Sequence, residues 1–166
     1  MIQDIVTSLA SIAWKVALKA YRQHTYKNRT YNLHDSYGSA VYLNGMLVKD
    51  SIRYIERAFS KKESRHYHTP VGAETGRKAL HRFLEQIVTP RKSDYITVVI
   101  AASMWYAKIV ESKGYIVLDS NFVKNEMKNE IKRNPELVNK MKQKYGIDYP
   151  TLQKWMGFDE TYEYDL

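Results

Sequence analysis

The chain has 166 residues, a formal net charge of +8 and no cysteine. Its length suits one domain with a core large enough to fold without disulfides or a metal, and the absence of cysteine excludes disulfide frameworks, thiolate zinc sites and cysteine nucleophiles. No stretch approaches the roughly 20 apolar residues of a membrane span, and the first residues lack the basic-then-apolar order of a signal peptide. We therefore expect synthesis in a reducing cytoplasm.

The positive charge is unevenly distributed along the chain. Residues 61–93 carry eight Lys or Arg against three Glu, whereas the last seven residues, with Glu163 and Asp165, carry only acidic charge. Such asymmetry indicates contact with nucleic acid or with an acidic protein face. A surface that serves only solubility explains it equally well.

Residues 2–24 are expected to form an amphipathic helix of about six turns, because apolar side chains recur at three- and four-residue steps. The apolar stripe consists of Ile2, Ile5, Val6, Leu9, Ile12, Ala13, Val16 and Ala20. The opposite face carries Gln3, Ser11, Lys15, Lys19 and Arg22. We expect the stripe to lie in the core, with a partner-binding helix as the alternative.

A polar, turn-prone segment at 25–36 precedes a β-hairpin. The runs 37–43 and 46–48 are β-prone and flank Asn44-Gly45, which accepts the positive φ angles of a type I′ turn. Residues 59–72 show no periodicity and end in Pro and Gly, so they predict a long, mobile, basic loop.

The middle of the chain predicts one more helix and two strands. Residues 74–88 place their apolar side chains on one face of a helix that Pro90 closes. The run 95–101 is the most β-like, and its lack of polar alternation predicts burial on both faces. Residues 103–111 suit a short helix, Gly114 breaks it, and 115–118 is predicted to be a second short strand.

The end of the chain is predicted to be helical. Apolar residues from Phe122 to Ile131 define one helix, and Asn134 is expected to cap another that begins at Pro135 and ends at Gly146. A last short segment begins at Tyr149. The predicted fold is α+β: a long N-terminal helix, a small, mainly antiparallel sheet with a hairpin, packed helices and a helical C-terminal tail. We expect an α+β domain over residues 1–133 and a helical extension over 134–166.

Residue patterns that carry catalysis are weak in this sequence. His66 and His68 flank Tyr67, but a zinc site needs three or four convergent ligands. His34-Asp35-Ser36 has the residue types of a catalytic triad, yet neighbours in sequence do not form the spatial relay. Residues 72–78 lack the spacing of a phosphate loop. Glu111 is one carboxylate without a partner. We predict no catalytic, cofactor or metal site.

Tyrosine is unusually frequent, with fourteen in the chain. Five of them lie close together in the sequence among basic residues: Tyr21, Tyr26, Tyr31, Tyr37 and Tyr42, with Lys15, Lys19, Lys27 and Arg29. Tyrosine is favoured at protein interfaces, and aromatic rings between basic residues can also stack on single-stranded nucleic acid. We favour a protein interface, because no RNA-binding motif is present.

Two segments carry the pattern of one known family. Residues 30–38 read Thr-Tyr-Asn-Leu-His-Asp-Ser-Tyr-Gly, and residues 95–118 read as an apolar strand, Met104-Trp105-Tyr106-Ala107, Val110-Glu111, Gly114 and Val117-Leu118. They resemble the Thr-Gly-x-Leu-x-x-Ser segment and the strand–helix–strand signature of the head–tail joining and tail-completion proteins of tailed bacteriophages. The motif residues are Thr30, Leu33, Ser36, Met104, Tyr106, Ala107 and Glu111. The resemblance covers roughly residues 2–133, with Tyr31 and Ser103 standing where the family has glycine.

The resemblance implies a non-enzymatic structural protein of the virion. Such a protein is made in the host cytoplasm and joins the connector to the tail as a ring subunit in the neck or upper tail. Its expected partners are copies of itself, the connector or portal-side ring, the tail tube or terminator proteins and, without sequence preference, the packaged DNA. No membrane or cofactor is implied. We expect basic side chains to contact the DNA channel or a neighbouring subunit, with these candidates: Lys61, Lys62, Arg65, Arg91 and Lys92.

Two alternatives remain open. A basic nucleic-acid-binding module is supported by the sequence pI of about 9.5 and by the mixture of aromatic and basic residues. A small nuclease-like enzyme would use Arg65, His66 and His68, but no cluster of acidic residues accompanies them.

Overall fold

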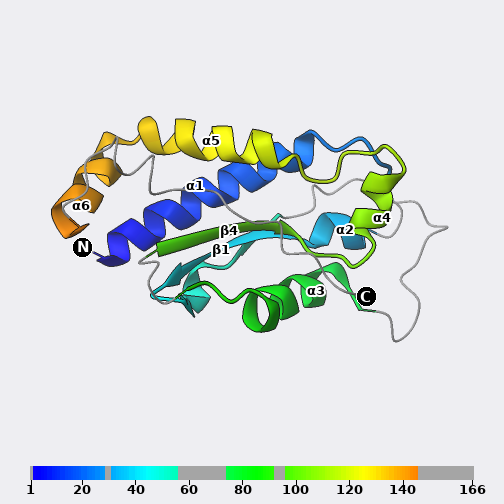
Figure 1. Cartoon of the computed structure of the whole chain (residues 1–166), viewed down its shortest axis with the longest axis horizontal. Coiled ribbons are helices and arrows are strands. Elements are labelled where there is room, and N and C mark those ends of the chain that lie inside the picture. Colours follow the sequence, from blue (N-terminus) through cyan, green and yellow to red (C-terminus); the bar gives the residue numbers. More distant parts are fainter. Residues whose placement is uncertain (1, 29–30, 56–73, 92–95, 146–166) are drawn as a thin grey trace.

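The computed structural model describes residues 2–28, 31–55, 74–91 and 96–145. It confirms the predicted α+β class, with a long N-terminal helix and a small antiparallel sheet (Figure 1). The helices are α1 (Ile2–Arg22), α2 (Asn32–Asp35), α3 (Gly76–Arg82), α4 (Ala107–Ser112), α5 (Ser120–Lys132) and α6 (Pro135–Tyr145), with a 3₁₀ turn η1 (Lys49–Ser51) and a π-helical turn η2 (Phe83–Ile87). The strands are β1 (Tyr37–Leu43), β2 (Met46–Leu47), β3 (Arg53–Tyr54) and β4 (Ile96–Ala102).

The sheet is built around β1, which pairs with all three other strands. β4 runs antiparallel along its whole length, from the Tyr37–Ala102 pair to the Leu43–Ile96 pair. On the other side, β2 pairs with one end of β1 and β3 with the opposite end. Figure 1 shows α1, α5 and α6 on one side of the sheet and α3 on the other. The sheet therefore has a hydrophobic cluster on each face.

The hairpin prediction is confirmed in its turn geometry. Asn44 has φ 49° and Gly45 has φ 79°, the two positive angles that a type I′ turn requires. Asparagine and glycine tolerate this left-handed region best. The turn matches the twist of the strands and sets the register in which Leu43 pairs with Met46.

The two terminal helical regions share one core. From Ile5 to Ala20 the apolar stripe of α1 is buried as predicted, whereas Ile2 is only partly buried, and the stripe packs with Leu137 and Met141 of α6. Asn134 caps α6, since its side-chain oxygen accepts the Leu137 N–H at 3.1 Å. This helix of the predicted C-terminal extension therefore packs on the core of the domain.

Strand β4 differs from its prediction in the degree of burial. Ile96, Val98 and Ile100 pack toward α1, whereas Val99 and Ala101 pack toward α3, so both faces of the strand are covered. Only Ala101 is fully buried. β4 lies at the edge of the sheet and has no partner strand on its outer side within the described residues, which leaves its other side chains partly exposed.

Residues 115–118 are not a strand, and that prediction was wrong. This segment pairs with no strand of the described sheet. Instead, two hydrogen bonds join Ile116 to Thr25. The Thr25 N–H donates to the Ile116 carbonyl (3.2 Å), and the Ile116 N–H donates to the Thr25 hydroxyl (2.8 Å). Two short elements were also missed, α2 within the turn-prone 25–36 segment and β3 after η1. Both are shorter than the repeats that periodicity can detect.

Two ion pairs tie α5 to α1. Lys19 Nζ lies 3.0 Å from both Glu126 and Glu130. The hydrogen bond from Lys19 holds the pKa of Glu130 below its usual value of 4.5, and the same contacts raise the pKa of Lys19. In α3, the Arg82 guanidinium lies 2.7 Å from Glu74 and likewise lowers the pKa of that carboxyl.

These carboxylates predict a loss of stability in acid. A depressed pKa contributes stability above the unfolded value, and the contribution is lost as the pH falls through the folded value. We expect the free energy of unfolding to fall below pH 4.5 by roughly 0.5 kcal/mol for each partly exposed pair. Urea denaturation at several pH values measures this. Glu130→Gln and Lys19→Gln should each reduce the loss of unfolding free energy between neutral pH and acid. If neither variant changes this pH dependence, the ion pair is not its source.

Candidate functional site

The structure brings the two motif segments into direct contact. The Ser36 carbonyl accepts hydrogen bonds from the main-chain N–H of Ser103 (3.2 Å) and from its hydroxyl (3.1 Å). The Ser36 hydroxyl in turn donates to the Leu33 carbonyl (2.7 Å). Leu33 and Met104 are buried in one cluster. The serine at position 103 therefore does what glycine cannot, since its side chain locks the end of β4 to the end of α2.

Tyr31 adopts a backbone conformation that favours glycine. Its φ is 63°, in the left-handed region, which bulky side chains rarely occupy. This is the position at which the resembled family has glycine. The next residue, Asn32, begins α2 and accepts the Gly76 N–H at 3.2 Å. The left-handed turn at Tyr31 thus directs the chain into the contact between α2 and α3.

Three of the five grouped tyrosines belong to the core, so the interface prediction was wrong for Tyr26, Tyr37 and Tyr42. The Tyr26 hydroxyl donates to that of Tyr37 (3.1 Å), which donates to the Val117 carbonyl. The Tyr42 hydroxyl donates to the Leu84 carbonyl (2.5 Å). Burial raises the pKa of Tyr26 and Tyr37 well above 10, so both remain neutral. These rings cannot form a stacking platform for bases.

The candidate chemical groups are held in local contacts. His34 is buried and bonds Asp35 at 2.8 Å, but the Ser36 hydroxyl points to the Leu33 carbonyl. Glu111 is exposed and accepts the Leu118 N–H at 3.2 Å. Within the described residues, no group of three or more His, Cys, Asp or Glu side chains could hold a metal ion. His66 and His68 lie outside the described residues.

The segment around α4 carries a set of four exposed large apolar side chains. Its members are Trp105, Ile109, Tyr115 and Ile116, which are between 41% and 48% exposed; we call this set the α4 surface. The same segment buries Met104 and Val117 in the core. Exposed apolar side chains are typical of protein–protein contact sites when they form a contiguous patch. The sequence prediction missed this surface because the burial of each side chain in so short a helix cannot be read from periodicity.

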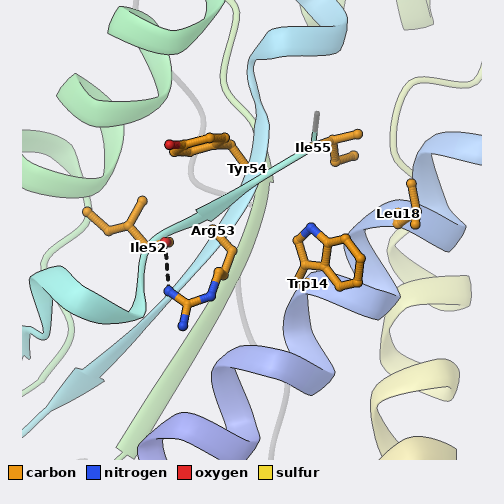
Figure 2. A pocket seen from close by; sticks show the side chains of 6 residues that line it. All are labelled: Trp14, Leu18, Ile52, Arg53, Tyr54 and Ile55. Carbon is orange, nitrogen blue, oxygen red and sulfur yellow. Dashed lines mark hydrogen bonds between the residues drawn. The ribbon is translucent and has the colours of Figure 1, made fainter. Parts of the chain in front are cut away.

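A groove between α1 and β3 forms a second candidate. A pocket of about 500 Å³ is lined by Trp14, Leu18, Ile52, Arg53, Tyr54 and Ile55. Figure 2 shows the Trp14 ring on α1 and the Arg53 side chain on β3, with the Arg53 guanidinium turned to the Ile52 carbonyl. A second pocket of only about 20 Å³ also has Arg53 in its lining and lies beside Gln3, Thr7 and Ala10 of α1. We call the two together the α1–β3 groove. Trp14, an exposed aromatic off the apolar stripe, was the signal in the sequence that could have located it.

Most of the basic residues predicted to contact DNA or a neighbouring subunit lie outside the described residues. Arg91 is exposed and follows Pro90 after η2. Lys61, Lys62, Arg65 and Lys92 lie outside the described residues, as do Thr30 and the basic loop at 59–72. Tyr106 and Ala107 are partly buried at the start of α4.

Comparisons with protein-family models, with curated proteins and with solved structures found no match to this chain. Among the helices of the described residues, none combines the length and the apolar character needed to cross a membrane. A functional hypothesis therefore depends on the residues themselves, and the two surfaces are their most distinctive feature.

Proposed function

We propose that this chain is a structural, non-enzymatic assembly protein, a ring subunit at the head–tail junction of a tailed bacteriophage. It joins the connector to the tail by binding copies of itself and neighbouring virion proteins. The observation that carries the proposal is the α4 surface. The segment that resembles the family's strand–helix–strand signature is anchored on its inner side and exposes large apolar side chains on its outer side.

Two further features support the resemblance. The two motif segments are far apart in sequence yet are bonded to each other through Ser36 and Ser103. The position of Tyr31, where the family has glycine, has the positive φ that glycine favours. Basic residues of the middle segment remain candidates for contact with packaged DNA, which they would bind without sequence preference.

The α4 surface predicts which substitution abolishes assembly. Trp105→Glu combined with Ile109→Glu should lower the amount of the chain in purified particles by about 30-fold, because aromatic side chains dominate interface energies. The fold should be retained, since both side chains are exposed. Quantitative mass spectrometry of particles measures the copy number, and circular dichroism checks the fold.

Met46→Glu is the matched control for this experiment. Met46 is also exposed and apolar, but it lies at the hairpin turn, at the end of β1 away from α4. Met46→Glu should leave incorporation unchanged. If the unsubstituted chain is abundant in cells and absent from particles, the structural function is wrong and nucleic-acid binding becomes the leading hypothesis.

A further inference from the structure

The α1–β3 groove combines a pocket of about 500 Å³ at one end with a shallow end of about 20 Å³. Its α1 wall runs from Gln3 to Leu18, a distance of roughly 22 Å at 1.5 Å per residue. That length accommodates about seven residues of extended chain. Trp14 and Leu18 offer apolar contact at the wide end. The groove therefore suits a short segment with large apolar side chains.

The charge of the groove defines its ligand further. The Arg53 guanidinium donates to the main-chain carbonyls of Asp50 (2.6 Å) and Ile52 (3.0 Å). It forms no ion pair with a carboxylate in the described part of the chain, although Asp50 lines the narrow part of the same groove. Because both bonds use Nη1, the Nε and Nη2 donors of Arg53 remain for an incoming carboxylate. The expected ligand is apolar and acidic.

The end of this chain has that composition. Residues 157–166 read Gly-Phe-Asp-Glu-Thr-Tyr-Glu-Tyr-Asp-Leu, with acidic side chains and no basic one. In the last five residues, apolar Tyr162, Tyr164 and Leu166 alternate with acidic Glu163 and Asp165. In an extended segment this alternation separates an apolar face from an acidic face. Such a segment can place rings against Trp14 and carboxylates within reach of Arg53.

The chain can deliver this segment to the groove. α6 ends at Tyr145 and packs on the first turns of α1, where Lys140 Nζ lies 3.7 Å from Asp4. Gln3, at the narrow end of the groove, is next to Asp4 in that turn. The intervening residues 146–156 can span up to roughly 36 Å when extended. A tether of this length gives millimolar effective concentrations, which favours the chain's own segment over that of a second copy.

We propose that residues 157–166 bind in the α1–β3 groove of their own chain, with the acidic side chains paired to Arg53. The bound segment covers the exposed Trp14 ring and neutralises the guanidinium. The proposal is independent of the head–tail assignment, since it concerns a contact within one chain.

Engineered cysteines test the contact, because the natural chain has none. In Thr7→Cys/Thr161→Cys, one thiol lies on the groove wall and the other in the acidic segment. We expect mild oxidation to give an intramolecular disulfide, seen as a faster-migrating monomer on a non-reducing gel. Asn129→Cys/Thr161→Cys is the matched control, because Asn129 is exposed on α5. It should cross-link about tenfold more slowly.

Charge reversal separates specific docking from chance collision. Glu163→Lys/Asp165→Lys alters no residue of the described part and should slow the Thr7–Thr161 cross-link by about tenfold, the equivalent of about 1.4 kcal/mol. Adding Arg53→Glu to that chain should restore the rate. Equal rates for the Thr7 and Asn129 pairs, or no response to charge reversal, would overturn the proposal. Disulfide-linked dimers would also overturn it and assign the groove to a second copy.

Discussion

Gly76→Ala is expected to destabilise the protein by about 3 kcal/mol, because the added methyl group has no room between α3 and α2. A Cβ at this position would lie 1.9 Å from the Asn32 carbonyl oxygen and 2.9 Å from the Asp35 Cβ. The nearest obstacle is main chain, which cannot rotate away as a side chain would. The whole of α3 would have to move from α2, and the bond between the Gly76 N–H and the Asn32 side chain would be lost.

Urea denaturation of the variant measures this loss as a lower midpoint at an unchanged slope. Two substitutions are controls. Lys78→Ala changes an exposed residue of the same helix and should alter stability by less than about 0.5 kcal/mol. Gly114→Ala has open space around its Cβ but a φ of +90°, so backbone strain alone should cost about 1 kcal/mol. A Gly76→Ala midpoint no lower than that of Gly114→Ala would contradict the contact.

The sequence predicted the elements whose signals are local and long. α1 repeats its apolar residues over many turns, the Asn44-Gly45 turn has a specific geometry, and Asn134-Pro135 marks the start of α6. Each of these was confirmed. Such patterns work because one periodicity, or one turn, is enough to define the structure.

The predictions that failed concern features that depend on contacts between distant segments of the chain. Residues 115–118 have β-prone side chains, but they pair with no strand of the described sheet, and the Ile116 main chain bonds to Thr25 instead. Tyr26 and Tyr37 look like interface residues by composition, yet both find buried hydroxyl or carbonyl partners. The α1–β3 groove requires β3, a two-residue strand without a sequence signal. Burial and pairing of this kind are set by tertiary contacts.

The two proposed surfaces are structurally linked to the core in different ways. The α1–β3 groove is carried by a long helix with a fully packed inner face. The α4 surface is carried by a helix of six residues, none of which is buried. Its position depends on the few anchors on either side of it, chiefly Met104 before α4 and Val117 after it. A variant that loosens one anchor should therefore affect assembly as well as stability.

Tyr37→Phe is the variant that tests this dependence, and we expect it to lower the free energy of unfolding by about 3 kcal/mol. The missing hydroxyl leaves two buried groups without partners, the Val117 carbonyl and the Tyr26 hydroxyl. Each unsatisfied group costs more than the hydrogen bond itself contributes. Tyr26→Phe is the matched control, because it removes one donor and leaves the bond between Tyr37 and Val117 in place. Its expected cost is about 1 kcal/mol.

Hydrogen exchange distinguishes a local effect from a general loss of stability. In Tyr37→Phe, the amides of Ile116 and Leu118 should exchange faster than the change in global stability explains, because their segment has lost its anchor. Amides of β1 that pair with β4 should follow global stability only. In the double variant, Tyr26→Phe should cost little further, since it removes a hydroxyl already left without an acceptor. Full additivity would show that the two hydroxyls do not act as one chain, and would remove the link between Tyr37 and the position of the α4 surface.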